Sequence, residues 1–215
     1  TLYAGGDGSA GAPYEIANWY HLDNVRENLD ANFTLTANLN KTTAGYDFVS
    51  NSTANGGDGF DPIWETGSQF TGTFDGAGHT ISGLRIARPG APDEMDGTDA
   101  ALIATLASGG VVSDITLVDA EITAGDGGNS STDTEATAGD GGDAAGLVAT
   151  NNGTITDSAV TQTTITAGAG GDVKPDSLTK TNTDHTGGTG GHTGVITAIN
   201  NGHVSASSTS NVTVT

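Results

Sequence analysis

Cysteine is absent from the 215 residues, so this chain forms no disulfide bond and offers no thiolate ligand to a metal. Aromatic residues make up only 5% of the chain and hydrophobic residues 34%, which leaves little bulk for an ordinary globular core. No apolar run approaches the ~18 residues that span a bilayer, and we expect no membrane insertion. The composition allows either partial disorder or a thin, regular core of small side chains.

Positive charge is also scarce. Six Lys and Arg residues stand against 26 Asp and Glu residues, which gives a formal net charge of −20 at pH 7. Nucleic acids and anionic membranes are poor partners for such a chain, because binding to either requires a basic surface. Molar salt shortens the screening length to ~3 Å and removes most of the self-repulsion. The balance favours a protein from brine, with an ordinary acidic secreted protein as the alternative.

Runs of β-branched residues recur along the chain in a fixed register. One run begins at Val111, a second at Thr154 and a third at His203, and a shorter run at Thr80 matches the first half of the pattern. Polar residues flank each apolar position, as in a strand. The apolar residues align in three columns: Ile81, Val112, Ile155 and Val204; Ile86, Leu117, Val160 and Thr209; Ile122, Ile165 and Val214.

Stacked strands of this kind predict an all-β fold, a right-handed parallel β-solenoid (β-helix) of about four coils. We expect "NNG" at 151–153 and 200–202 to form corners with left-handed backbone. The Gly/Asp tracts at 124–143 and 167–192 both follow "ITAG", so they predict inserted loops that emerge on one side of the solenoid. These loops are either disordered or ordered by neighbouring subunits or cations.

Residues 1–69 form a separate N-terminal section in this interpretation, and residues 70–215 hold the repeats. Leu22, Val25 and Leu29 lie at helical spacing after Asn18, a suitable N-cap. This short helix would cover the open edge of the first coil. An alternating strand at 32–40 and a long loop at 41–69 follow, and Phe60 and Trp64 are expected to pack the loop onto the solenoid.

The segment "AGLVATNNGTITDSAVTQTTIT" at 145–166 resembles the GLUG-type repeat of β-solenoid surface proteins. The stretch "FTGTFDGAGHTISGLRI" at 70–86 resembles the segment that leads into such repeats, and residues 8–40 resemble the opening of many secreted surface proteins. The resemblance implies an extracellular or cell-surface location, and with the acidic composition it suggests a halophilic archaeon. It does not specify function, because such repeats occur in adhesins, protease accessory regions and surface layers. The long Gly/Asp insertions depart from the family's pattern.

Calcium is the metal that the sequence suggests, although no cofactor is required. "GGDGFD" at 56–61 fits a Gly-Gly-x-Gly-x-Asp loop, in which carboxylates and carbonyls bind Ca²⁺. Fragments of the same pattern occur at 124–130 and 138–143. The alternative is a glycine-rich loop solvated by its own acids. The candidate ligands are Asp58, Asp61, Asp126, Asp140 and Asp143.

Sequons for N-glycosylation occur at six positions and are consistent with an exterior glycoprotein. They are Asn32, Asn40, Asn51, Asn129, Asn152 and Asn211.

No catalytic residue is assigned. Asp114 and Asp157 share a column and would lie about 5 Å apart, a separation that suits a retaining glycosidase. No cation or aromatic residue is expected beside them, so an exposed acidic pair on a halophilic surface is the preferred interpretation. A polysaccharide-acting β-helix enzyme therefore ranks third among the functions considered. Thr-rich columns near Thr164 and Thr213 also allow ice binding, as a minor alternative.

The last run, "NVTVT", leaves a strand edge without a cover in this interpretation. Either further coils follow, or the edge docks onto the start of a second copy by strand addition. Our main hypothesis is a structural subunit of an extracellular filament, pilus-like fibre or surface layer, a homopolymer that does not act as an enzyme. The alternative is an adhesin or binding repeat domain of a larger cell-surface glycoprotein, with glycans among its partners. The expected assembly contacts are Thr1, Leu2, Tyr3, Val212 and Val214.

Overall fold

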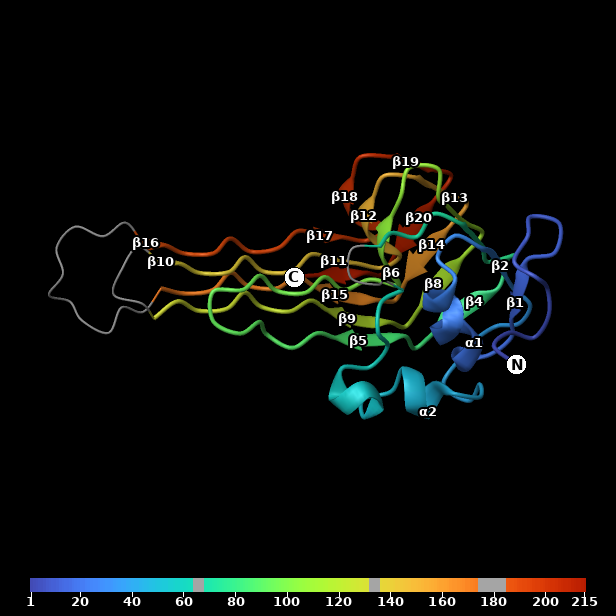
Figure 1. The fold of residues 1–215 in the computed structure, drawn as a ribbon, viewed down its shortest axis with the longest axis horizontal. Helices are drawn as coiled ribbons and strands as arrows, with labels where there is room; N and C mark the ends of the chain where they lie inside the picture. Colours follow the sequence, from blue (N-terminus) through green and yellow to red (C-terminus); the bar gives the residue numbers. More distant parts are fainter. Residues whose placement is uncertain (64–67, 132–135, 174–184) are drawn as a thin grey trace, which may run out of the picture.

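The computed structural model describes residues 1–63, 68–131, 136–173 and 185–215. Its strands are mostly short, and every pair within the sheets is parallel. Figure 1 shows a stacked body of strands from which a bundle of extended segments runs away in one direction. No helix within the described residues is long and apolar enough to cross a membrane.

The largest sheet has six strands in the order β1-β2-β3-β7-β13-β19. Within it, Val112 pairs with Ile155 and Ile155 pairs with Val204, as the repeats predict. Its strands are β1 (Tyr14–Ile16), β2 (Asn32–Leu35), β3 (Thr73–Asp75), β7 (Val111–Ser113), β13 (Thr154–Thr156) and β19 (His203–Ser205).

Two four-stranded sheets and one three-stranded sheet complete the stacked body. Each strand again pairs with its equivalent in the neighbouring repeat, which gives a parallel, solenoid-like arrangement. The strands are β4 (Thr80–Ser82), β8 (Thr116–Val118), β14 (Ala159–Thr161) and β20 (Ser208–Ser210); β5 (Arg85–Ala87), β9 (Glu121–Thr123), β15 (Thr164–Thr166) and β21 (Thr213–Val214); β6 (Ile103–Leu106), β12 (Val148–Asn151) and β18 (Thr197–Asn200).

The predicted columns are confirmed except at the first repeat. Leu117 pairs with Val160 and then Thr209, and Ile122 pairs with Ile165 and then Val214. The placement of the two earliest residues was wrong, because Ile81 pairs with Leu117 and Ile86 pairs with Ile122. The place below Val112 belongs to Phe74. The sequence alignment missed this shift because Phe74 is aromatic where the later repeats carry Val or Ile.

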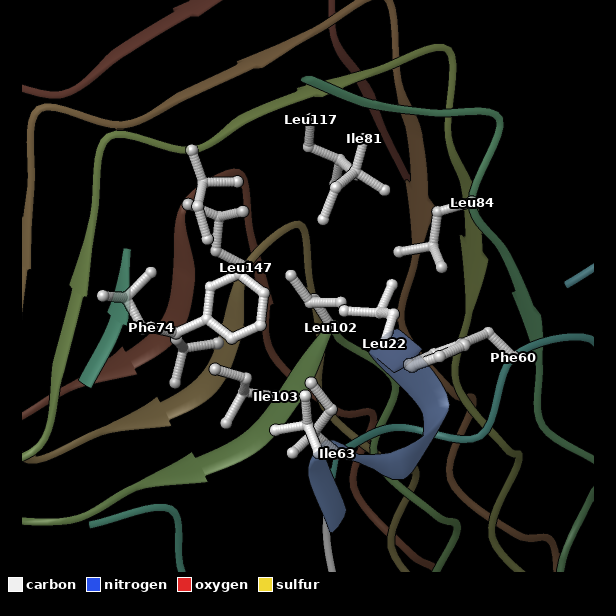
Figure 2. Close-up of a cluster of buried hydrophobic side chains, with 14 of the residues drawn as sticks. Leu22, Phe60, Ile63, Phe74, Ile81, Leu84, Leu102, Ile103, Leu117 and Leu147 are labelled. Carbon is white, nitrogen blue, oxygen red and sulfur yellow. The ribbon is translucent and has the colours of Figure 1, made fainter. Parts of the chain in front are cut away.

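The core is a narrow stack of completely buried apolar side chains. Figure 2 shows Phe74, Ile81, Leu84, Leu102 and Leu117 pointing into one interior from different strands and corners. Leu, Ile, Val and Ala supply most of this core, and the larger rings gather towards the N-terminal end. The low aromatic content therefore reflects a thin core, because each strand contributes only one row of side chains to the interior.

A short helical segment covers the N-terminal end of the stack. It consists of α1 (Trp19–Asp23) followed by the 3₁₀ turn η1 (Asn24–Glu27). Asn18 is the N-cap, as predicted, and its side chain accepts a hydrogen bond from the His21 N–H at 3.0 Å. Trp19, Leu22 and Val25 are completely buried, and Figure 2 places Leu22 beside Phe60 and Leu84. The helix therefore closes the stack with side chains.

The excursion at 41–63 is held against the stack by arginines. It contains α2 (Tyr46–Val49) and η2 (Ala54–Gly57). Arg85 Nη1 donates to the Gly57 carbonyl at 2.6 Å, and Arg26 Nη2 donates to the Asp61 carbonyl at 2.9 Å. The Arg26 guanidinium also lies 5.7 Å from the ring centroid of Phe60, which is completely buried, as expected. Trp64, expected to pack beside it, lies outside the described residues.

The described basic residues are all used in internal ion pairs. Arg88 and Arg26 pair with Asp61, Arg85 with Glu121, and Lys41 with Asp119. Apart from the residues that the structure does not describe, the surface is therefore left with an excess of carboxylates.

The corners differ from the prediction. Asn151, Asn152 and Gly153 do not have left-handed backbone, which occurs instead at Asp114 (φ 51°) and Asp157 (φ 50°). The Asn151 side chain is buried; its Oδ1 accepts from the Gly153 N–H at 3.0 Å and its Nδ2 donates to Asn200 Oδ1 at 2.8 Å. The repeated asparagine thus makes the turn with its side chain. Glycine follows because a Cβ at position 153 would lie 2.4 Å from the carbonyl oxygen of Gly110.

Candidate functional site: the glycine-rich arm

The Gly/Asp tracts form an ordered arm in the part of the chain that the structure describes. Three layers leave the stack after β5, β9 and β15, on one side as predicted, and each runs out and returns (Figure 1). Their outgoing segments are residues 88–94, 124–131 and 167–173, and their returning segments are residues 95–99, 136–143 and 185–192. Two short pairs add to them: β10 (Ala136–Thr137) with β16 (His185–Thr186), and β11 (Ala144–Ala145) with β17 (Thr193–Gly194).

Every third backbone N–H donates to the next layer, and we call these the forward-donating positions. In the second layer, Ala124 N–H donates to the Thr166 carbonyl and Gly127 N–H to the Ala169 carbonyl, at 2.9 and 2.8 Å. In the returning segment, Ala138, Gly141 and Ala144 donate in the same way. A period of three residues is that of the extended, left-handed polyproline II conformation, which has no hydrogen bonds of its own. The arm is therefore held together entirely by bonds between segments.

A second set of N–H groups links outgoing and returning segments. Gly139 N–H donates to the Gly128 carbonyl and Gly142 N–H to the Gly125 carbonyl, both at 2.9 Å. Glycine is required because the backbones approach closely: a Cβ at Gly139 would lie 1.8 Å from the carbonyl oxygen of Met95. Collagen places glycine at every third residue for a similar reason.

Side-chain oxygens accept the N–H at the third position of each triplet. Asp140 Oδ1 accepts from the Thr189 N–H at 2.7 Å, and Asp143 Oδ1 accepts from the His192 N–H at 2.6 Å. Four more such contacts join residue pairs in the same columns: Asp96 with Asp140, Asp99 with Asp143, Asp126 with Ala169, and Asn129 with Asp172. Aspartate and asparagine thus complete the hydrogen bonding of the backbone, which explains why the tracts alternate glycine with Asp or Asn.

The first layer of the arm carries proline where the second layer carries glycine. Arg88 N–H donates to the Thr123 carbonyl, so Arg88 occupies the place of Ala124 one layer earlier. Pro89 then stands where the second layer has Gly125, and Pro92 stands where it has Gly128. Those glycines donate backward to Thr98 and Met95 carbonyls. In the first layer no described arm segment lies behind them, and proline has no N–H to satisfy.

Two carboxylates of the arm have shifted acidity. Burial raises the pKa of Asp99; the hydrogen bond from the Asp143 N–H opposes this rise, and the neighbouring Asp143 carboxylate adds to it. The hydrogen bond from the Thr189 backbone lowers the pKa of Asp140. The charged form is therefore disfavoured at Asp99 and favoured at Asp140.

Four of the five candidate calcium ligands have carboxylates engaged in other contacts. Asp61 pairs with Arg88, and Asp126, Asp140 and Asp143 accept backbone N–H groups. Asp58 contributes its carbonyl to the Ala87 N–H. Among the described residues, no cluster of three or more His, Asp or Glu side chains is arranged to hold a metal ion. Calcium binding stays a prediction, and the structure gives most of these carboxylates a structural role.

The six sequons differ in how free their side chains are. Asn40 is exposed and Asn211 is exposed at a left-handed corner. Asn32 lies in β2 and its Nδ2 donates to the Gly8 carbonyl at 3.0 Å, while Asn51 Nδ2 donates to Asp47 Oδ1 at 3.2 Å. The Oδ1 atoms of Asn129 and Asn152 accept hydrogen bonds from the Asp172 N–H and from Asn201 Nδ2. The Oδ1 atoms of Asn40 and Asn51 are engaged as well, by Thr42 and by Thr53.

The carboxylate pair considered for catalysis lies at equivalent corners. Asp114 and Asp157 follow the paired strands β7 and β13, and both have left-handed backbone. Asp157 Oδ2 accepts a hydrogen bond from Thr156 Oγ1 at 2.8 Å. No described cation is paired with either residue.

The predicted assembly residues fall into two groups. Tyr3 is buried in the chain's own core, stacked on Tyr14 with ring centroids 4.2 Å apart, and its hydroxyl donates to the Asn24 carbonyl. Thr1 and Leu2 are exposed, Leu2 to 56%. At the other end, Val212 packs against the core and Val214 is 44% exposed on β21.

The triplet register of the arm was not predicted from the sequence. The signal was present, because "AGDGGN" at 124–129 and "AGDGGD" at 138–143 carry glycine at every third residue. Short tracts of this composition also suit disordered loops, and only the neighbouring layers give the triplets a partner.

Comparison with known proteins gives partial relatives. The chain is 38% identical over 122 residues to Halomucin of Haloquadratum walsbyi, a match that covers 55% of this chain and 1% of that protein. It is 32% identical over 125 residues to a protein of Evansella cellulosilytica named as a Gly-rich membrane protein, covering 57% of this chain and 13% of that one. This chain thus spans only a small part of both curated relatives.

A solved structure described as an immunoglobulin A1 protease from Bacteroides ovatus aligns with 99% of this chain and 78% of its own, at a TM-score of 0.35 and 12% identity. A likeness this remote carries no argument about fold or function. No family model matches the chain, so the GLUG-type resemblance stays a prediction. The comparisons establish partial similarity to Halomucin and to a Gly-rich membrane protein.

Proposed function

We propose that the chain is a non-catalytic structural module of a large cell-surface protein of a saline environment, one that holds a glycine-rich arm away from its body. The observation that carries this proposal is the use of the arm's carboxylates: they complete the backbone hydrogen bonding of the next layer. Such side chains build a rigid projection and leave little chemistry for a substrate. The partial similarity to Halomucin, of which the match covers 1%, supports a module within a long chain.

The proposal has three further parts: the coils wind in a right-handed sense and number about four, a domain boundary lies near residue 69, and the exposed sequons carry glycans. The similarity to a protein named as a Gly-rich membrane protein also supports the surface location. The net charge of −20 and the internal pairing of the described basic residues support the saline setting.

Immunogold labelling of intact native cells with antibodies against the folded chain tests the location. Label on the cell exterior supports the proposal, and label confined to the interior refutes it. Denaturant unfolding at low and molar NaCl tests the saline setting, because screening of carboxylate repulsion should raise the free energy of unfolding. A free energy of unfolding that falls with salt would refute that part.

A filament subunit is the second candidate function. The observation that favours it is the last strand of each sheet in the stacked body: β18, β19, β20 and β21 have one neighbour each, and Val214 is 44% exposed. Strand addition by a second copy would cover these edges.

Negative-stain images in molar salt test the filament directly. Val214→Asp should abolish filaments and leave the fold intact, whereas deletion of residues 1–4 would also remove buried Tyr3 and is less informative. Monomeric particles of the unaltered chain would refute the filament and leave the structural module standing.

A further inference from the structure

The third layer of the arm presents an incomplete face. Its forward-donating positions include Ala167, Gly170, Gly187 and Gly190. Ala167 N–H donates to the Thr215 carbonyl, whereas the other three N–H groups have no acceptor among the described residues. The carbonyls of Gly188 and Gly191 likewise accept no hydrogen bond from the described chain. In the second layer the equivalent carbonyls, at Gly139 and Gly142, accept from Gly171 and Gly168 of the third.

Glycine at position 190 gives independent evidence. The same column holds Gly97 in the first layer and Gly141 in the second. A Cβ at Gly97 would lie 1.9 Å from the Gly125 carbonyl oxygen, and a Cβ at Gly141 would lie 2.0 Å from that of Gly168. In both cases the outgoing segment of the next layer requires the glycine. At Gly190 the nearest atom to a Cβ is 3.8 Å away, and the same distance holds at Gly187.

Nothing in the described chain therefore explains glycine at 190, where it costs conformational entropy. Position 187 carries no such weight, because its column holds Ala138 in the second layer. In the first two layers, the segment that lies against this column is an extended backbone with glycine at every third residue. The unpaired groups match that occupant, because the Gly188 and Gly191 carbonyls need N–H donors and the Gly170 N–H needs a carbonyl.

We propose that the face formed by residues 167–173 and 186–192 binds an extended polypeptide segment that carries glycine at every third position. The segment lies on the third layer as residues 167–173 lie on the second. Its glycine N–H groups donate to Gly188 and Gly191, and one of its carbonyls accepts from Gly170.

The first layer of a second copy does not fit this place. Its outgoing segment has Pro89 and Pro92 where Gly168 and Gly171 of the third layer donate their N–H groups. The pyrrolidine rings remove both donors and fill the space of the close approach. The partner is therefore a different glycine-rich segment.

The test is a titration of the ¹⁵N-labelled full chain in molar NaCl with a blocked synthetic peptide of sequence TAGAGGDV, that of residues 166–173. We expect the amide signals of Gly170, Gly187 and Gly190 to shift at millimolar peptide. The matched control peptide TAPAGPDV places proline where the two donors are and should produce no shift. Gly190→Ala should abolish the shifts, because its methyl group fills the approach and meets this chain only at an ordinary contact distance, 3.8 Å from the Gly168 carbonyl oxygen.

Gly11→Ala is the matched protein control, since a Cβ there meets nothing within 4 Å and lies far along the chain from the arm. It should bind the peptide like the unaltered chain. Absence of shifts with TAGAGGDV, or equal shifts with TAPAGPDV, would overturn the proposal. Concentration-dependent dimerisation of the chain alone, with these amides protected, would assign the face to a second copy and also overturn it. None of these outcomes depends on where the protein is located in the cell.

Discussion

The Asp143 carboxylate accepts a hydrogen bond from the backbone N–H of His192, 49 residues further along the chain, at 2.6 Å. The same oxygen lies 2.9 Å from His192 Nδ1. Asp99 makes the equivalent contact with the Asp143 N–H one layer earlier, at 2.8 Å. An acidic side chain in this arm thus serves mainly as an acceptor for the backbone of its neighbour.

Asp143→Ala should loosen the returning segment of the third layer, because the His192 N–H loses its acceptor. We expect a local cost of about 1 kcal/mol, measured as faster amide hydrogen exchange at His192. Asp143→Asn is the control and should exchange like the unaltered chain, since its Oδ1 remains an acceptor and Asn129 already fills such a place. If amide exchange at His192 is accelerated equally in both variants, the charge of Asp143 matters and its role as an acceptor does not.

Two glycines of one column should respond differently to alanine. Gly141→Ala places a methyl group 2.0 Å from the Gly168 carbonyl oxygen and should cost about 2 kcal/mol in the free energy of unfolding. Gly190→Ala meets nothing closer than 3.8 Å and should leave stability within about 0.5 kcal/mol. Thermal unfolding of the two variants makes the comparison, and similar losses would contradict the layered packing.

Asp99→Asn should stabilise the protein at neutral pH. The pKa of Asp99 is raised in the folded state above its ordinary value of 3.8, so its ionisation opposes folding once the pH rises through this range. Asparagine keeps the acceptor for the Asp143 N–H and removes the charge. The gain should be present at pH 7 and vanish at pH 3, where both forms of the site are uncharged.

Asp140→Asn is the opposite case for the same measurement. The pKa of Asp140 is lowered by the Thr189 N–H, so its ionised form contributes stability above its ordinary value of 3.8 that is lost as the pH falls. Denaturant unfolding of the two variants at pH 3 and pH 7 should give pH-dependent changes of opposite sign. A gain at Asp99→Asn that is unchanged at pH 3 would exclude the ionisation as its cause.

Core truncation should be most costly in the middle of the stack. Ile155 is completely buried between Val112 and Val204, and Ile155→Ala should cost about 3 kcal/mol in the free energy of unfolding. Val204 is only partly buried, so Val204→Ala should cost about 1 kcal/mol. Urea titration gives both values, and a larger loss at Val204 would imply that an unseen partner covers the last layer.

Glycan occupancy should follow the freedom of the asparagine amide. Asn40 and Asn211 should be modified in protein isolated from its native source, because both are exposed and neither Nδ2 is engaged by a described residue. Asn32 should be unmodified, since its Nδ2 donates to Gly8 inside the sheet. Glycopeptide mass spectrometry reads all three sites in one experiment, and modification at Asn32 alone would contradict this order.

The sequence alone determined the stacked strands, because the alternation of Ile and Val with polar residues admits only one face for the core. The pairing of Val112, Ile155 and Val204 follows from that alternation, as does the N-cap at Asn18. The single side on which the Gly/Asp tracts emerge follows from the shared "ITAG" before them. The alternation did not place Ile81 and Ile86 correctly, because a first repeat that carries an aromatic residue can be aligned one strand out of register.

Only the tertiary structure decided what the tracts and corners do. A glycine triplet has no internal hydrogen bonds, so its conformation depends on neighbours tens of residues away, such as Gly168 beside Gly142. The roles of Asp143 as a backbone acceptor and of Asn151 as a turn-forming side chain exist only once the layers are stacked. The same stacking exposed the unpaired groups of Gly170 and Gly190, because an N–H is free or bound according to what lies across from it, and not according to its own residue type.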